Sequence, residues 1–294
     1  MIYSVYNQIV MMQIDNLDEL IKSALREDVG DGDHSTLACI PPDAVNTAKI
    51  VAKADGIVCG VEVAGRIFHL VDPTLELCAA LADGDRVCRG DIIMTVGGHA
   101  GSILTAERTV LNFMQRMSGI ATETHRMLQM LDGLDTRLLD TRKTTPNMRL
   151  LEKYAVHCGG GTNHRIGLYD MIMLKDNHVD FAGGIEAAID RTHDYLRRNG
   201  KALKIEIEVR DLDELQRVLD HGGVDRIMLD NFDIPTLREA VRRIQAWPVR
   251  YETEASGGIT EATLRPYAET GVDFISVGAL THHIKSLDIS LVKK

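Results

Sequence analysis

Six short apolar runs alternate with helical segments through the second half of the chain. The runs read "TRLLDT", "YDMIMLKD", "LKIEIEV", "DRIMLDN", "VRYETEAS" and "DFISVGAL". They begin roughly 20–35 residues apart, which is the length of one strand with its following helix. Strands joined by helices pair in parallel, so the pattern predicts an α/β fold with a parallel sheet. Such a sheet either closes into a barrel or stays open with helices on both faces.

Polar or small residues follow the end of every run. In a parallel barrel all of these ends open on one mouth, whereas an open sheet gathers its functional loops at one switch point. The spread over all six ends therefore favours a barrel. The residues concerned are Arg142, Lys143, Lys175, Glu208, Asp230, Ser256 and Gly278.

The first part of the chain has a different pattern of apolar residues. Residues 16–28 have apolar positions at helical spacing, with Asn16 as the cap. Short β-type runs between residues 47 and 98 are separated by Gly and Asp turns, which is typical of a small, mostly antiparallel sheet.

A long helix is expected over residues 104–131. Its apolar positions fit a period of about 3.6 residues, and Thr105 is a suitable cap. Ser118 and Gly119 form a candidate break inside it.

Charge and hydropathy exclude several kinds of partner. The formal net charge is −10, which argues against nucleic acid and against an anionic membrane surface. No apolar run approaches the roughly 18 residues of a membrane span. The first residues, "MIYSVYNQIVMMQID", lack the features of a signal peptide, so a cytoplasmic location is expected.

The five cysteines are expected to be buried, reduced thiols. Their number is odd and their spacing matches no zinc motif. Scattered free thiols are typical of a reducing compartment. They stand at positions 39, 59, 78, 88 and 158.

Residues 140–146, "DTRKTTP", place two adjacent cations directly after an apolar run. Between residues 137 and 178 there are seven Lys and Arg against four Asp and Glu, in a chain that is acidic as a whole. A solvated surface can carry such charges. Adjacent cations backed by the glycines at 159–161 nevertheless favour an anion site.

The last two strand ends are rich in glycine. "ASGGIT" at 255–260 and "SVGAL" at 276–280 would let backbone amides approach a phosphate closely, with a helix N-terminus behind them. Two ordinary turns remain the alternative.

Glu208 and Asp230 stand at neighbouring strand ends. Two carboxylates there can bind Mg²⁺ or a ribose diol, or they form structural pairs with Lys or Arg. Glu206 precedes Glu208 by two positions and so faces the same side of the strand, which in a barrel is the interior. Glu206 is therefore expected to be a buried structural partner.

Eight stretches of the chain resemble the quinolinate phosphoribosyltransferases, also called carboxylating nicotinate-nucleotide pyrophosphorylases. They occur in the family's order over nearly the whole chain. A paralogue from molybdate loci shares much of this pattern, so the resemblance bears more on fold and phosphoribosyl chemistry than on the base used. The stretches are "LREDVGDGDHST", "TAERTVLNFMQRMSGIAT", "DTRKTTPNMRLLEKYAV", "GGGTNHRIGLYDMIMLKDNH", "IEIEV", "IMLDNF", "EASGGIT" and "ISVGAL".

The resemblance implies an incomplete α/β barrel beside an open-faced α/β sandwich. The sandwich is expected over residues 1–121 and the barrel over residues 122–280, with residues 281–294 packing back on the sandwich. The implied assembly is a homodimer in which the sandwich of one chain covers the barrel mouth of its partner, or a hexamer of such dimers.

The implied reaction is a pentosyl transfer. The phosphoribosyl group of phosphoribosyl pyrophosphate joins quinolinate, pyrophosphate and CO₂ leave, and nicotinate mononucleotide forms for de novo NAD biosynthesis. Mg²⁺ is the implied cofactor, and no organic cofactor is needed. By the resemblance, Lys143, Lys175, Glu208 and Asp230 are catalytic, and the two acids serve the ribose hydroxyls and Mg²⁺, directly or indirectly. The implied substrate-binding residues are Arg108, which reaches the partner's site, Arg142, Lys143, His164, Arg165, Lys175, Glu208, Asp230, Ser256, Gly257, Gly258 and Gly278.

Two other functions compete with this interpretation. A Schiff-base lyase would use Lys143 or Lys175 at a strand end, and borohydride with substrate would trap it. A metabolite sensor would bind a nucleotide without turnover, but the sequence carries no appended DNA-binding or partner domain.

Overall fold

The computed structural model describes residues 16–293. The prediction that the chain does not begin with a signal peptide concerns residues 1–15, which lie outside the described part. The chain forms two compact units. The second unit comprises Met127–Lys143 and Gly161–Gly278, and the first comprises the described residues up to 126 with 144–160 and 279–293. Residues 144–160 thus belong to the first unit, although the predicted barrel domain, residues 122–280, includes them.

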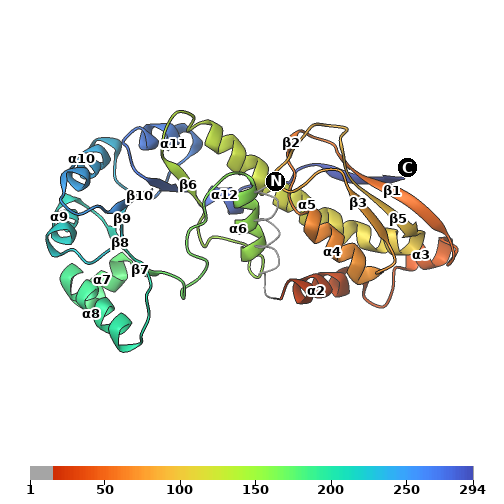
Figure 1. Ribbon diagram of the computed structural model, residues 1–294, viewed down its shortest axis with the longest axis horizontal. Helices are drawn as coiled ribbons and strands as arrows, with labels where there is room; N and C mark the ends of the chain where they lie inside the picture. Colours follow the sequence, from red (N-terminus) through yellow and green to blue (C-terminus); the bar gives the residue numbers. More distant parts are fainter. Residues whose placement is uncertain (1–15, 294) are drawn as a thin grey trace. The chain divides into compact units, whose positions relative to one another are not determined.

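The second unit is built on a six-stranded sheet in which all pairings are parallel. All six predicted strands are present (Figure 1). They are β6 (Arg137–Leu139), β7 (Ile172–Leu174), β8 (Ile205–Val209), β9 (Arg226–Asp230), β10 (Glu252–Ser256) and β11 (Phe274–Ser276).

The strand order identifies this sheet as a barrel with one open seam. The order is β6-β11-β10-β9-β8-β7, so each strand lies beside its neighbour in the sequence, except that β6 and β7 form the two edges. The first strand pairs with the last, as in a closed barrel, while β6 and β7 stay unpaired with each other. This arrangement confirms the predicted incomplete (β/α) barrel.

Helices follow the strands and lie along the outer side of the sheet (Figure 1). Their starts have identifiable caps: Asp211 accepts from the backbone N–H groups of Asp213 and Glu214, and Asp233 accepts from that of Thr236. The helices are α7 (Asp176–Ala182), α8 (Ile185–Arg198), α9 (Leu212–His221), α10 (Ile234–Ala246) and α11 (Glu261–Ala268).

The first unit contains a four-stranded antiparallel sheet of order β12-β1-β5-β3, with the short pair β2 and β4 beside it. The edge strand β12 comes from the last described residues and pairs along β1, with Leu291 opposite Ile50. The strands are β1 (Val45–Ala52), β2 (Gly56–Ile57), β3 (Glu76–Ala79), β4 (Arg86–Val87), β5 (Ile92–His99) and β12 (Ile289–Lys293).

Six helices accompany these strands in the described part of the first unit. The predicted helix after Asn16 is present, but the Asn16 side chain makes no capping hydrogen bond. The helices are α2 (Leu17–Val29), α3 (His34–Cys39), α4 (Val61–Val71), α5 (Ala100–Gln129), α6 (Arg149–Cys158) and α12 (Ala279–His282).

Helix α5 differs from its prediction at its start and in its middle. It begins at Ala100, directly after β5, rather than at Thr105, whose hydroxyl donates to Asp33 instead. It also continues through Gly119 without a break. A Cβ at that position would lie 2.5 Å from the carbonyl oxygen of Lys285, so close packing explains this glycine.

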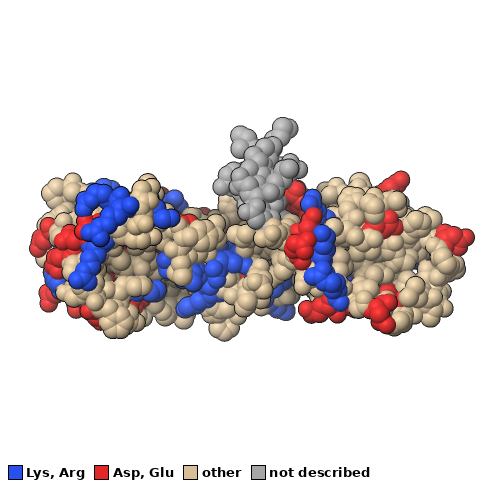
Figure 2. All heavy atoms as spheres, turned by 90° about the horizontal axis from the view of Figure 1, so that it is seen from below, with Lys and Arg blue, Asp and Glu red and all other residues tan. Residues whose placement is uncertain are grey.

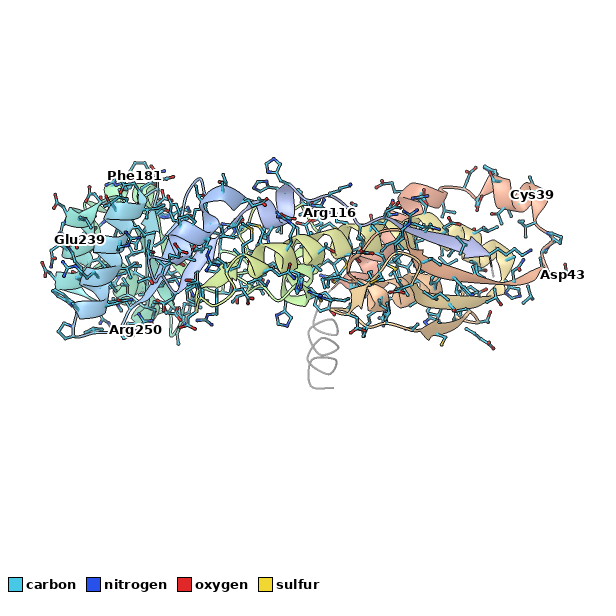
Figure 3. The ribbon with its side chains drawn as sticks, turned by 90° about the horizontal axis from the view of Figure 1, so that it is seen from above. Cys39, Asp43, Arg116, Phe181, Glu239 and Arg250 are labelled. Carbon is cyan, nitrogen blue, oxygen red and sulfur yellow. The ribbon has the colours of Figure 1, made fainter. Side chains whose placement is uncertain are left out.

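The cysteines are all free, but their burial was predicted wrongly for three of them. Cys39, Cys78 and Cys88 are exposed, Cys158 is half-buried and only Cys59 is fully buried. Figure 3 shows Cys39 near one end of the chain's first unit. No helix in the range 16–293 is both long and apolar enough to cross a membrane.

Candidate active site

Because the six strands are parallel, their carboxyl ends bring the predicted side chains to one edge of the sheet. Asp230 and Ser256 are the last residues of β9 and β10, and Glu208 lies near the end of β8. Lys175 follows β7 directly and precedes α7, while Lys143 and Gly278 lie in the segments after β6 and β11.

A fully buried carboxylate, Asp140, organises the segment after β6. It accepts from the backbone N–H of His164 at 2.8 Å and from Asn163 Nδ2 at 2.6 Å. Leu139 also forms a parallel bridge to Thr162, so the segment that carries His164 and Arg165 is fixed to the edge of the barrel. Sequence reasoning missed Asp140, although an acid that ends an apolar run just before "TRK" was a usable signal.

Arg165 and Arg142 lie close enough to repel one another. Burial is the larger cause that lowers the pKa of Arg165, and the Arg142 guanidinium lowers it further. The Arg165 side chain is half-buried and donates to the carbonyl oxygen of Met171 at 3.2 Å, which holds it in place. Two guanidinium groups that act on each other in this way favour an anion as a shared partner.

The His164 ring is buried, and its Nε2 lies 3.1 Å from Glu206 Oε2 and 3.2 Å from Glu254 Oε2. The substrate-binding role that the resemblance gives His164 stays a prediction. Glu206 is fully buried, which confirms the prediction that it is an interior partner. Arg226, which sequence reasoning missed, pairs with Glu254 at 3.1 Å. His164 therefore belongs to a buried polar network, and its backbone positions Arg165.

The charges of this network act on each other's protonation. The two carboxylates outweigh the effect of burial and raise the pKa of His164 to about 9. Burial and the Glu254 charge raise the pKa of Glu206 to about 7. The backbone N–H of Arg165 also donates to His164 Nδ1 at 2.7 Å, so the ring and the arginine that follows it are held together.

Glu208, Asp230 and Lys175 form a second electrostatic cluster at the mouth. Lys175 Nζ lies 3.3 Å from Glu208 Oε2. Burial raises the pKa of Glu208, with Lys175 opposing and Asp230 adding to the increase. Burial also raises the pKa of Asp230, against the charges of Lys175 and Lys143. Two half-buried neighbouring carboxylates whose pKa values are raised suit a divalent cation with oxygen ligands, so these residues fit Mg²⁺.

The turn after β10 depends on glycine. Gly257 has a φ of +97°, and a Cβ there would lie 2.2 Å from Asn231 Oδ1. Asn231 in turn donates its backbone N–H to Ser256 O at 2.8 Å and its Nδ2 to Asp230 Oδ2 at 2.6 Å. These hydrogen bonds join the ends of β9 and β10. The space beside Gly258 is open, since a Cβ there would meet nothing within 4 Å. Asn231 is the last residue of the apolar run "DRIMLDN", but sequence reasoning missed its role in this turn.

Arg108 belongs to the first unit, where it is exposed on α5. Its predicted contact with a partner's site therefore stays a prediction.

Although the chain has a net charge of −10, one of its faces carries groups of Lys and Arg side chains beside acidic ones (Figure 2).

Comparison with known proteins places the chain in a family. The model for the quinolinate phosphoribosyl transferase N-terminal domain matches residues 33–118, and that for the C-terminal domain matches residues 120–292. A mitochondrial quinolinate phosphoribosyltransferase [decarboxylating] of Nicotiana tabacum is 45% identical over 94% of this chain and 82% of its own length. A probable nicotinate-nucleotide pyrophosphorylase [carboxylating] of Bacillus subtilis is 41% identical over 94% of this chain and 92% of its own.

Solved structures agree in fold. NadC from Streptococcus pyogenes superimposes with a TM-score of 0.89 at 38% identity, covering 95% of this chain and 97% of that one. The nicotinate-nucleotide pyrophosphorylase from Francisella tularensis gives the same TM-score and identity, covering 95% and 96%. With both domains matched and the strand-end residues in place, the chain belongs to the quinolinate phosphoribosyl transferase family.

Proposed function

We propose that the mouth of the incomplete barrel carries out the reaction of this family. The phosphoribosyl group of phosphoribosyl pyrophosphate is transferred to quinolinate, with loss of pyrophosphate and CO₂, to give nicotinate mononucleotide for NAD biosynthesis. The observation that supports this assignment most directly is the pair Arg142 and Arg165, two mutually repelling guanidinium groups at the mouth of an otherwise acidic protein. A small dianion relieves that repulsion, and quinolinate carries two carboxylates.

Quinolinate binds to Arg142 and Arg165, and Asp140 fixes the segment that carries Arg165. Arg108 completes this pocket from the partner chain of a homodimer, in which the first unit of one chain covers the barrel mouth of the other. The dimers in turn can assemble into a hexamer. An arginine can bind a carboxylate through two parallel hydrogen bonds, which fixes the plane of the pyridine ring.

Phosphoribosyl pyrophosphate occupies the opposite side of the mouth. The backbone of Ser256, Gly257, Gly258 and Gly278 receives its 5′-phosphate, where the open space at Gly258 leaves room. Lys143 and Lys175 bind the pyrophosphate. Glu208 and Asp230 bind the ribose hydroxyls and hold Mg²⁺, which, when bound, offsets the negative charge of the leaving pyrophosphate.

The residues act mainly by orientation and charge. The arginines direct the ring nitrogen of quinolinate at the anomeric carbon, where a C–N bond forms as the C–O bond to pyrophosphate breaks. Lys143 and Lys175 stabilise the charge that develops on the leaving oxygens. The quaternised nitrogen then draws electrons from the ring, so the neighbouring C–C bond breaks, CO₂ leaves, and the ring carbon takes up a proton.

The five free cysteines fit a reducing compartment, and we place the protein in the cytoplasm on that basis. The tobacco relative is named as mitochondrial, so fractionation of the source cells is the direct measurement.

The activity is tested with quinolinate that carries a label in the carboxylate next to the ring nitrogen. Release of labelled CO₂ should need phosphoribosyl pyrophosphate and Mg²⁺ together, and nicotinate mononucleotide should appear in equal amount. Binding of both substrates without CO₂ release would indicate the sensor alternative. Labelled substrate trapped on Lys143 or Lys175 by borohydride would indicate the Schiff-base lyase.

A further inference from the structure

Two cysteines and an aspartate meet in the first unit, in a cluster that the proposed reaction does not use. Cys59 precedes α4, Asp83 lies in the loop between β3 and β4, and Cys158 ends α6. One sulfur from each cysteine and one carboxylate oxygen all lie within 4.8 Å of one another. The three residues are far apart in the sequence, which is why their spacing gave no zinc motif.

The geometry of the cluster is set by its neighbours. Asp83 accepts from the backbone N–H of Val61 at 2.8 Å through Oδ1 and from the Tyr154 hydroxyl at 2.9 Å through Oδ2. The backbone N–H and carbonyl of Cys59 are both bound by Ser118 Oγ, at 2.9 and 3.0 Å. Hydrogen bonds of this kind orient metal ligands in proteins, and their loss weakens metal binding.

The chemistry of the cluster also suits a cation. Its three groups all become anions on deprotonation, and their ligand atoms lie within 4.8 Å of one another. A bound divalent cation offsets the repulsion between such anions, because it stabilises thiolates directly.

A pocket adjoins the Asp83 end of the cluster. Its volume is about 450 Å³, and both Asp83 and Tyr154 line it, together with Glu62 and His69 of α4. The pocket leaves room beside the Asp83 carboxylate for a water as a fourth ligand.

We propose that Cys59, Asp83 and Cys158 form a site for a thiophilic divalent metal ion of the Zn²⁺ class. Two thiolates, a carboxylate and a water make a tetrahedral set, in which Zn–S and Zn–O bonds of about 2.3 and 2.0 Å separate the ligand atoms by less than about 4 Å. The observed cluster needs only a small contraction to reach that size. Binding converts two thiols into thiolates and so releases two protons per ion.

The ion would join three separate segments of the first unit. It ties the start of α4, the β3–β4 loop and the end of α6, the helix that follows the "TRKTTP" segment. This role is structural and does not depend on the Mg²⁺ of the proposed reaction.

Cobalt provides the probe, since Co²⁺ replaces Zn²⁺ and reports thiolate ligands by charge-transfer absorption in the near ultraviolet. The full chain is reduced, treated with a chelator and titrated with Co²⁺ under argon. We expect one Co²⁺ per chain, a thiolate charge-transfer band with tetrahedral d–d bands, and release of two protons. Zn²⁺ should displace the cobalt and abolish the bands.

Variants locate the site. Cys158→Ser and Asp83→Asn should weaken Co²⁺ binding at least about tenfold, the size expected for loss of a ligand. The matched control changes the three exposed cysteines together, Cys39→Ser, Cys78→Ser and Cys88→Ser, and should bind as the wild type does. Cys59 is fully buried and its variant can fail to fold, so the test does not depend on it.

Several results would overturn the proposal. They are absence of the charge-transfer band in the folded wild type, an unchanged band intensity and Co²⁺ affinity in Cys158→Ser, and loss of the band in the exposed-cysteine variant. A Cys59–Cys158 disulfide formed in air, found as a peptide cross-link in a chain that takes up no Co²⁺ after reduction, would assign the pair to redox chemistry instead.

Discussion

Arg116 and Glu152 form a two-point ion pair inside the first unit. Arg116 Nε and Nη2 lie 2.8 and 2.7 Å from the same Glu152 oxygen, and Glu152 is fully buried. The other Glu152 oxygen accepts from the backbone N–H of Thr145 at 3.1 Å, and Arg116 Nη2 donates to Thr281 O at 2.9 Å. One ion pair thus fixes both the segment after Lys143 and the segment after Gly278; Arg116 is labelled in Figure 3.

Replacing Arg116 by Met should destabilise the protein by about 2 to 4 kcal/mol, because Glu152 would keep a buried charge without its partner. Urea unfolding measures this free energy. The matched control is Arg126→Met on the same helix, whose pair with Glu123 is exposed and should be worth less than about 1 kcal/mol. Equal losses of unfolding free energy in the two variants would contradict the conclusion that the buried Arg116–Glu152 pair stabilises the protein more than an exposed pair does.

Asp140→Asn should impair the binding of quinolinate more than that of phosphoribosyl pyrophosphate. The amide keeps one oxygen, so its NH2 group would face either the His164 backbone N–H or Asn163 Nδ2, and the lost hydrogen bond would loosen the segment that holds Arg165. We expect a loss of about 1 to 3 kcal/mol in kcat/KM, mostly as a higher KM for quinolinate. Asp190→Asn, on the exposed surface of α8, is the control. An equal rise in both KM values would show a general defect instead.

Arg165→Ala should cost about 2 to 4 kcal/mol of transition-state stabilisation, because a bound carboxylate loses a charged partner. Nicotinate has one carboxylate where quinolinate has two, and it should be a very poor substrate of the wild type. Steady-state rates with each base give both numbers. Efficient use of nicotinate would rule out a pocket built to read two carboxylates.

Chains that carry Arg108→Ala and Lys143→Ala should restore one another's activity when mixed. If each site takes Arg108 from one chain and Lys143 from the other, a mixed dimer has one intact site and one with both defects. Random exchange makes about half of the dimers mixed, so activity should return to about a quarter of the wild type. The assay is turnover after co-refolding of equal amounts, with each variant refolded alone as the control. If mixed dimers form and no activity returns, Arg108 does not act across the interface.

Asp273 should stabilise the barrel at neutral pH and lose this effect in acid. Its burial alone would raise the pKa, but hydrogen bonds from Thr253 and Arg250 outweigh burial and hold the pKa of Asp273 below its usual value. A carboxylate with a lowered folded-state pKa contributes stability above its unfolded value of about 3.9, and loses it as the pH falls through the folded value. Asp273→Asn should therefore cost about 1 to 3 kcal/mol at pH 7 and progressively less below about pH 4.

The measurement for Asp273 is urea unfolding of both proteins between neutral and acid pH. Asp194→Asn on the surface of α8 is the control and should change stability little at any pH. Since Asp273 precedes β11, at the opposite end of the strand from Gly278, kcat should stay unchanged. A stability difference that does not depend on pH would contradict the role given to its charge.

The sequence predicts the strands of the second unit well because they recur between helical segments at the spacing of strand–helix units and most of them contain apolar β-type residues. It also predicts Glu206 as an interior residue, because residues two positions apart in a strand face the same side, and Glu206 is buried as expected. It does not predict the contacts of His164 with Glu206 and Glu254, because a histidine beside an arginine in a loop shows no sign that two carboxylates from distant strands lie against it.

The remaining differences also come from tertiary contacts. Gly119 looks like a break within a helix until Lys285 O is found against it. Thr105 looks like a cap, but β5 leads straight into α5 and the helix begins five residues earlier, at Ala100. The meeting of Cys59 with Cys158 depends on the return of α6 to the first unit, which no local pattern encodes.

The pairing of strands that are distant in the sequence bears on how this protein folds. The sheet of the first unit is incomplete until β12 pairs with β1, and β6 acquires its neighbour only when β11 has docked. Contacts of such high sequence separation slow folding, because a long loop must close before they form. A chain in which β11 and β12 have not yet docked therefore exposes unpaired edges of β1 and β6, and such edges promote aggregation.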